Sequence, residues 1–168
     1  PLLYASSSCI HNWWLSPYGV SKKVNEETAY EKQVGLRFTT VYGDGARESM
    51  LIGKLIDGTV QYLTRHVRDF VHVSDVVNAN LMSMDSDITH EFFNVGTNTA
   101  ITIIDLAKTI IECSGLNIEP IFGPALDGDV HQTKANIDLI KKKIGWEPSI
   151  MLVDWIKDII SSKKFNEI

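Results

Sequence analysis

Residues 16–45 read SPYGVSKKVNEETAYEKQVGLRFTTVYGDG, and this stretch decides the fold class. Ser16-Pro17 is a typical helix start, with serine as the N-cap and proline at the first helical position. We expect this helix to continue to Gln33 and to be stopped by Gly35. Residues 36–42 (LRFTTVY) are rich in β-branched and aromatic side chains and are followed by Gly-Asp-Gly, which predicts a strand and then a turn.

The alternation of strand and helix extends to both ends of the chain. Upstream, residues 2–5 form an apolar run that ends in three serines, which indicates a strand. Downstream, strands are expected at residues 60–63, 69–73, 91–95 and 118–122. Helices are expected after an N-cap at Ser74, with Val77, Leu81 and Met84 on one face, from a capping box at Thr102 to Gly115, and at residues 136–143 and 152–161. Strands that alternate with helices predict an α/β protein with a largely parallel sheet.

The composition excludes several classes of protein. With 44% hydrophobic and 22% charged residues, the 168-residue chain resembles an average globular protein and not a disordered one. A net charge of −5 without a basic stripe argues against nucleic-acid binding. No apolar stretch approaches the roughly 20 residues of a membrane span. Two cysteines, Cys9 and Cys113, are too few for a disulfide framework, and no signal peptide is evident, so a cytoplasmic protein is expected.

Tyr18 and Lys22 are the candidate catalytic pair. Their spacing of four residues places both side chains on one face of the expected helix. A tyrosine hydroxyl titrates near about pH 10 and is a poor base at neutral pH. A cation beside it favours the phenolate and brings it into range to take a proton from an alcohol. Because the Y-x-x-x-K pattern also occurs in ordinary amphipathic helices, its meaning depends on the surrounding motifs.

The order of motifs resembles the extended short-chain dehydrogenase/reductase family, and within it the nucleotide-sugar epimerases and dehydratases. The resemblance covers nearly the whole chain, and UDP-glucuronate 4-epimerases are similar over residues 40–50. The matching segments, in chain order, are the serines at 6–8, YGVSK at 18–22, LRFTTVYG at 36–43, RDFVHVSDV at 68–76, FNVG at 93–96, GDV at 128–130 with Thr133, Ala135 and Asn136, and GWEP at 145–148.

The resemblance implies a two-domain architecture. The expected fold is the C-terminal half of a Rossmann-type doubly wound parallel sheet with a small α/β substrate-binding domain. Residues 1–48 and 67–96 would belong to the NAD-binding domain, and residues 49–66 and 97–168 to the nucleotide-sugar domain. A homodimer formed through the tyrosine-bearing helix is also implied.

The resemblance also implies the roles of the candidate site residues. Tyr18 would be the catalytic acid/base, and Lys22 would bind the nicotinamide ribose and lower the tyrosine pKa. Ser7 would complete the catalytic set, with its neighbour Ser8 as the alternative and Cys9 next to them. The residues that would contact NAD are Tyr18, Lys22, Ser6 and Val41. The residues that would bind the nucleotide sugar are Thr40, Arg47, Arg68 and Asp129.

Arg68 matches the arginine that contacts the diphosphate in this family, a natural role for a bidentate cation. The alternative for Arg68 is a structural salt bridge to a neighbour such as Asp75. Leu126 stands where many relatives carry a second diphosphate-binding arginine. The histidines at 66, 72, 90 and 131 lack metal-ligand spacing, so no metal is expected.

The implied reaction begins when Tyr18 takes the proton of a sugar hydroxyl and the carbon beneath gives a hydride to NAD. Dehydratases of the family carry Asp-Glu directly after the catalytic serine or threonine, and decarboxylases carry Glu, whereas this chain has Ser8-Cys9. That favours epimerisation, with C4 of a UDP-hexose or UDP-uronic acid as the expected position. Residues 7–10 (SSCI) are also similar to GDP-fucose synthases, so a GDP-4-keto-6-deoxyhexose 3,5-epimerase/reductase is the alternative enzyme.

The cofactor half of the family pattern is missing from these residues. No G-x-G-x-x-G motif occurs for a dinucleotide pyrophosphate, and the sequence opens on Pro1 without methionine. We therefore expect the 168 residues to be the catalytic and substrate-binding half of a larger enzyme, inactive without an N-terminal half. The alternative is a non-catalytic remnant that binds a nucleotide sugar or a partner.

Overall fold

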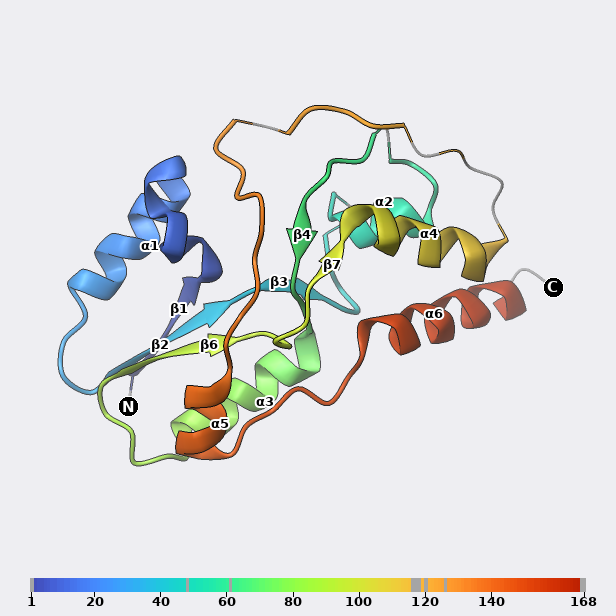
Figure 1. The fold of residues 1–168 in the computed structure, drawn as a ribbon. Helices are drawn as coiled ribbons and strands as arrows, with labels where there is room; N and C mark the ends of the chain where they lie inside the picture. The colour runs from blue at the N-terminus through green and yellow to red at the C-terminus, as the bar shows by residue number, and fades with distance from the viewer. Residues whose placement is uncertain are drawn as a thin grey trace.

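The computed structural model describes residues 2–47, 49–60, 62–115, 119, 121–125 and 127–166. A parallel three-stranded sheet, in the order β1-β2-β6, organises the first half of the chain. Its strands are β1 (Leu2–Ser7), β2 (Gln33–Phe38) and β6 (Glu91–Val95). The helices around it are the 3-10 helix η1 (Ser8–Leu15), α1 (Pro17–Glu27), α3 (Val73–Met84) and α5 (Asp138–Ile144). In Figure 1, α1 lies on one face of this sheet and α3 and α5 lie on the other.

Two further strand pairs connect this sheet to a helical layer. β3 (Thr40–Tyr42) pairs in parallel with β5 (Phe70–His72), and β4 (Val67–Arg68) pairs antiparallel with β7 (Ile101–Thr102). Beyond them lie α2 (Leu51–Ile56), α4 (Ile103–Ser114) and α6 (Leu152–Asn166) (Figure 1). The mixed α/β architecture with parallel strands confirms the expected fold class. Among the described helices, none is both long and apolar enough to cross a membrane.

Strand β5 faces two separate hydrophobic cores. Neighbouring strand residues point to opposite sides, so Phe70 enters one core and Val71 enters the other. The core around Val71, between the sheet and α3 and α5, includes Val34, Leu36, Phe93, Val95, Ile140 and Trp146. The core around Phe70, between α2, α4 and α6, includes Ile52, Ile103, Leu106, Ile110 and Ile156.

The Asp69 side chain connects two segments that are far apart in the sequence, the loop after β6 and the segment at residues 133–135. It is fully buried, and its Oδ1 accepts hydrogen bonds from the Thr97 amide at 2.8 Å and from the Thr97 hydroxyl at 2.7 Å. Oδ2 accepts from the Ala135 amide at 3.0 Å, and the Asp69 amide donates to the Thr133 hydroxyl at 3.3 Å. A buried carboxylate is tolerated only with such partners, so the positions of both loops are set by this one side chain.

Asp75 fastens the segment after α5 to α3. Its Oδ1 accepts from the amide and the hydroxyl of Ser149 at 3.1 and 2.7 Å, and its Oδ2 accepts from the Ile150 amide at 3.0 Å. The Trp146 indole nitrogen donates to the backbone carbonyl of Asp75 at 3.1 Å. The GWEP segment and the residues after it therefore pack against the start of α3, although the two parts are far apart in the sequence.

The expected end of the first helix is wrong. α1 ends at Glu27 and not at Gln33, because residues 33–38 form the central strand of the sheet. Gly35 is a strand residue: a Cβ atom there would lie 2.7 Å from the Tyr4 hydroxyl oxygen and 2.9 Å from Phe92. The glycine makes room for cross-strand aromatic side chains and does not end a helix.

Two expected strands also differ in the structure. The strand expected at 36–42 is broken at Thr39, where the chain changes partner: the Thr39 amide donates to the Val95 carbonyl and the Thr40 amide to the Asp69 carbonyl. Within the strand expected at 60–63, Leu63 forms an isolated bridge with Phe122, and position 61 lies outside the described residues. Positions 118 and 120 of the strand expected at 118–122 lie outside the described residues.

Helix α3 differs from its expected form in two ways. Its N-cap is His72 and not Ser74, because the His72 ring nitrogen Nδ1 accepts a hydrogen bond from the Ser74 amide at 3.2 Å. Its apolar stripe of Val77, Leu81 and Met84 is exposed, and the helix instead buries a face of small and polar residues, Asp75, Ala79 and Ser83. The docked C-terminal segment needs small residues and a carboxylate on that face.

Replacement of Asp75 by alanine is expected to lower the free energy of unfolding by about 3 to 5 kcal/mol, because two backbone amides and one hydroxyl of the docked segment lose their buried acceptor. Urea unfolding followed by circular dichroism measures the change. Asp85→Ala, an exposed aspartate at the end of the same helix, is the control and should change the stability by less than about 0.5 kcal/mol. Equal losses in the two variants would show that Asp75 does not hold the C-terminal segment.

Candidate functional site

The structure brings Tyr18 and Lys22 together at the start of α1. The helix is capped by Ser16, whose hydroxyl accepts from the Gly19 amide at 3.1 Å, with Pro17 in the first turn. The Lys22 Nζ atom lies 5.5 Å from the centroid of the Tyr18 ring and donates to the Ala5 carbonyl at 2.8 Å. The ammonium is therefore held between the tyrosine and the end of β1, while the Tyr18 side chain is 53% exposed and accessible.

The serines at the end of β1, Ser6 and Ser7, make contacts in different directions. The Ser7 hydroxyl caps η1 by accepting from the Cys9 amide at 3.2 Å. The Ser6 hydroxyl donates to Glu26 Oε1 at 2.5 Å on the face covered by α1. Ser8 and Cys9 are partly buried in η1, and Cys9 is a free thiol. The Ser6 hydroxyl is thus bound to Glu26 beneath α1, whereas the Ser7 side chain lies on the opposite side of the strand.

A buried ion pair that the sequence analysis missed fixes α1 on the sheet. Arg37 Nε and Nη2 donate to Glu26 Oε1 and Oε2 at 2.8 and 2.6 Å, and the two side chains are only 20% and 6% exposed. Glu26 follows Tyr18 by eight residues and Lys22 by four, so all three lie on one helical face. That spacing was the feature of the sequence that could have pointed to Glu26 as a residue supporting Tyr18 and Lys22. The pair holds the face of α1 that carries Tyr18 and Lys22 against β1 and β2.

A cavity of about 430 Å³ lies beside β3, α2 and β4. It is lined by four of the expected site residues, Thr40, Val41, Arg68 and Asp129. Its apolar wall includes Leu51, Ile52, Ile56, Phe70, Ile103 and Trp155. Tyr18 and Lys22 are not among the described residues that line it. Gly128, the neighbour of Asp129, nevertheless packs against Leu15 and Ser16, directly before the start of α1.

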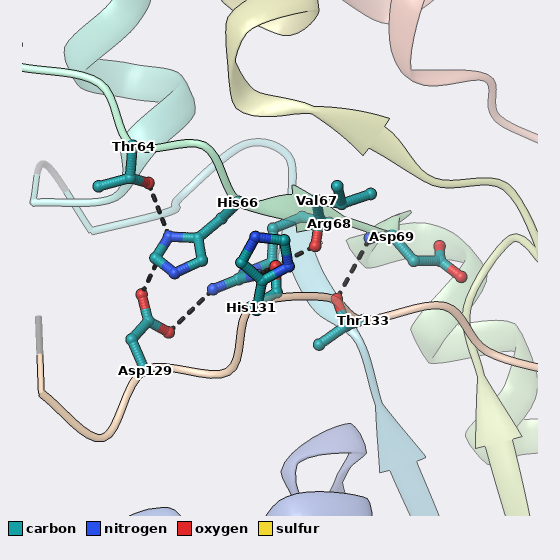
Figure 2. Close-up of polar contacts among 8 residues, drawn as sticks. All are labelled: Thr64, His66, Val67, Arg68, Asp69, Asp129, His131 and Thr133. Carbon is teal, nitrogen blue, oxygen red and sulfur yellow. Dashed lines mark hydrogen bonds and ion pairs between the residues drawn. The ribbon is translucent and has the colours of Figure 1, made fainter. Parts of the chain in front are cut away.

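Arg68 and Asp129 form an ion pair at the cavity wall. Arg68 Nη2 donates to Asp129 Oδ1 at 2.8 Å, and Arg68 Nη1 donates to the carbonyls of Val67 and His131 at 3.0 and 3.1 Å (Figure 2). The Arg68 side chain is 13% exposed and that of Asp129 is 43% exposed. Arg68 thus makes a salt bridge, as its alternative role predicted, but the partner is Asp129 and not Asp75, which binds Ser149 and Ile150.

His66 is a further lining residue that the sequence analysis did not select. It is 4% exposed, and its Nδ1 atom lies 2.6 Å from the Thr64 hydroxyl oxygen and 3.5 Å from Asp129 Oδ2 (Figure 2). Burial lowers the pKa of His66, Asp129 acts in the opposite direction, and Arg68 and His131 lower it further. The sequence offered one indication of this role. His66 lies two residues before Arg68, and in an extended segment that spacing puts both side chains on the same side.

Arg47 does not reach the cavity. Its side chain is exposed and its Nη2 atom lies 3.8 Å from the Met50 sulfur, although Ala46 and Met50 themselves line the cavity. Leu126 lies outside the described residues. Within the described ranges, no group of three or more histidine, cysteine, aspartate or glutamate side chains is arranged to hold a metal ion.

Comparison with known proteins gives a consistent set of similarities. A model of the NAD dependent epimerase/dehydratase family matches residues 14–96. The chain is 31% identical over 153 residues to UDP-glucuronic acid decarboxylase 5 of Arabidopsis thaliana, a match that covers 82% of this chain and 45% of that protein.

Two solved structures are similar over nearly the whole chain. MoeE5 in complex with UDP-glucose and NAD has a TM-score of 0.85 and 28% identity, with 99% of this chain and 65% of that one covered. UDP-glucose 4-epimerase of Thermotoga maritima, in complex with UDP-glucose, has a TM-score of 0.79 and 25% identity, with 99% and 64% covered. The chain spans about half the length of the curated relatives it matches.

Replacement of Glu26 by alanine is expected to destabilise the protein by about 3 to 5 kcal/mol, because it leaves the Arg37 guanidinium buried without its partner. Amide hydrogen exchange should show α1 opening before the rest of the sheet. The control is Glu27→Ala, which removes an exposed pair with Lys23 worth about 0.3 to 0.5 kcal/mol. If α1 in the Glu26 variant exchanges no faster than in the Glu27 variant, the ion pair does not anchor the helix.

Proposed function

The chain belongs to the NAD dependent epimerase/dehydratase family, and we propose that it carries the acid/base and substrate-binding residues for NAD-dependent epimerisation of a nucleotide sugar at C4 of a UDP-hexose or UDP-uronic acid. The observation that carries this proposal is Lys22, held between the Tyr18 ring and the Ala5 carbonyl at the end of a parallel strand. Residues 1–48 and 67–96 would contribute to an NAD-binding domain, and residues 49–66 and 97–168 to a sugar-binding domain.

The residues around Tyr18 fit the nicotinamide-ribose end of NAD. Open parallel sheets bind ligands at the carboxyl ends of their strands. Ser7 is the last residue of β1, and Lys22 is anchored close by at the Ala5 carbonyl. An ammonium and hydroxyl groups are suitable partners for ribose hydroxyls. The chemistry that NAD supplies when bound is the acceptance and return of a hydride.

Tyr18 has the exposure and the neighbour that a proton acceptor needs. Its side chain is 53% exposed, so a sugar hydroxyl can approach the phenol. The Lys22 ammonium lies 5.5 Å from the centroid of the Tyr18 ring, so a cation is next to the phenol. Tyr18 would take the hydroxyl proton as the hydride leaves, and would return it when the hydride comes back to the other face of the sugar ring.

Arg68 and Asp129 support binding of the nucleotide diphosphate part. The Arg68 guanidinium already has its charge partly balanced by Asp129, and both lie at the wall of a cavity within the usual size range of ligand pockets. A guanidinium suits phosphate oxygens, and a carboxylate suits the hydroxyl groups of a ribose. Thr40 and Val41 line the same cavity and would lie on the ligand's path towards Tyr18.

Epimerisation is favoured over elimination and decarboxylation by the residues after Ser7. Ser8 and Cys9 supply no carboxylate at the position where the dehydratases and decarboxylases of the family carry one. One relative is nevertheless a UDP-glucuronic acid decarboxylase, so the products must be identified directly. The free thiol of Cys9 makes the 3,5-epimerase/reductase the second candidate, and a requirement for NADPH with a GDP-keto sugar would identify it.

We extend the proposal to the assembly and location of the protein. α1 exposes Val20 and Val24, which are 40% and 47% accessible and would pair with a second copy in a homodimer. A cytoplasmic protein fits a chain that contains only two cysteines.

Replacement of Tyr18 by phenylalanine in the intact protein is expected to lower the rate of interconversion of UDP-glucose and UDP-galactose, or of the corresponding uronic acids, by about 100-fold to 10,000-fold. UDP-glucose binding should be retained, because Tyr18 is not among the residues lining the cavity. Chromatography of the nucleotide sugars with added NAD measures both products and rate.

Tyr30→Phe is the matched control, because Tyr30 is 76% exposed just beyond the end of α1, and it should leave turnover unchanged. Full turnover by the Tyr18 variant would overturn the mechanism. Binding of UDP-glucose without any turnover by the unmodified protein would favour the non-catalytic alternative.

A further inference from the structure

His66 is the one strongly buried titratable side chain in direct contact with the Arg68–Asp129 pair among the described residues. Its backbone is fixed, because the Ile103 amide donates to the His66 carbonyl at 2.9 Å where α4 begins. Its ring cannot move away from the pair without losing the Thr64 hydroxyl at 2.6 Å. The imidazole is therefore a fixed part of the cavity wall (Figure 2).

A single carboxylate connects the imidazole to the guanidinium. Asp129 Oδ1 binds Arg68 at 2.8 Å, and Asp129 Oδ2 lies 3.5 Å from His66 Nδ1. Asp129 is 43% exposed and belongs to the loop before Val130, so these two contacts are what hold its side chain at the wall. A change in the charge of His66 acts directly on the orientation of Asp129 and on the electrostatic potential at Arg68.

We propose that His66 is a positioning residue for the Arg68–Asp129 pair and that it takes up a proton when a nucleoside diphosphate sugar binds, so that the affinity for this ligand rises as the pH falls. This inference rests on the proposed function, in which Arg68 receives the diphosphate. It goes further by assigning a proton to the binding step.

The charges around His66 account for the direction of the effect. The titratable and charged groups that face it are Asp129 and His131 from the segment after β7 and α4, and Arg68 from β4; Thr64 is neutral. Burial, Arg68 and His131 all disfavour the imidazolium, and only Asp129 favours it. Without ligand, these neighbours together lower the pKa of the ring and favour its neutral form.

A bound diphosphate would reverse this balance. It brings two negative charges to Arg68 and offsets the guanidinium that disfavours the imidazolium. The pKa of His66 is then higher in the complex than in the free protein. By linkage, the gain in affinity is fully present below the pKa of the free protein and disappears as the pH rises through the pKa of the complex.

The test is titration calorimetry of the intact protein with UDP-glucose between about pH 5.5 and pH 8. UDP-glucose is the appropriate probe because its diphosphate is esterified at both ends, whereas a terminal phosphate has a pKa of about 6 and would itself titrate. The dissociation constant is expected to be about tenfold lower at the acidic end than at the alkaline end, the direction that proton uptake on binding requires. Paired buffers of different ionisation enthalpy should show proton uptake on binding.

His66→Gln keeps a side chain that can hydrogen-bond to Thr64 and Asp129 but removes the titration. It should bind with a dissociation constant that is nearly independent of pH and without proton uptake. His131→Gln is the matched control: its ring lies 5.8 Å from that of His66, and its replacement should preserve the pH dependence. A purely structural role for His66 would weaken binding equally at every pH.

The outcomes separate this inference from the proposed function. A pH-independent dissociation constant in the unmodified protein overturns the inference while leaving the proposed function intact, and it does so even if the His66 variant fails to fold. Loss of the pH dependence in the His131 variant alone also overturns it. No binding of UDP-glucose at any pH overturns both.

Discussion

The buried carboxylate of Asp69 is the constraint on which the arrangement of the site depends. It satisfies the backbone of the loop after β6 and of the segment after Asp129, two parts of the chain that are far apart in sequence. An unpaired carboxylate in that place would be prohibitively costly, so both segments must be present for the fold to close. Because Arg68 precedes Asp69 and Asp129 precedes Ala135, closing this contact also brings the ion pair of the cavity wall together.

The segment RDFVHVSD at 68–75 connects every layer of the molecule. Phe70 and Val71 point into different cores, and Asp75 receives the segment that leads to α6. Four consecutive residues, from the end of β4 into β5, thus carry a candidate binding side chain, a buried polar link and two core contacts. Because neighbouring residues of this segment contact opposite sides of the molecule, a substitution that shifts its backbone is expected to disturb several of these contacts at once.

The candidate acid/base is held by a separate device. The ion pair between Glu26 and Arg37 fixes α1 to β2, and the hydrogen bond from Lys22 to the Ala5 carbonyl fixes it to β1. Tyr18 remains exposed on this rigid support, which is the arrangement expected of a residue that must meet a ligand and still keep its orientation. The candidate acid/base and the candidate binding pair are thus positioned by different buried charges, the Glu26–Arg37 pair and Asp69.

The sequence by itself determined the α/β class, the family and the Tyr18–Lys22 pair, because local periodicity, capping and ordered motifs carry that information. It did not determine where α1 ends, because Gly35 is needed beneath Tyr4 and Phe92 rather than at a helix terminus. It also did not indicate that Arg68 pairs with Asp129, or that His66 lies against the same carboxylate. Those contacts join residues some sixty positions apart, and only the closing of the chain around Asp69 decides them, since burial of a charge selects partners by proximity in space.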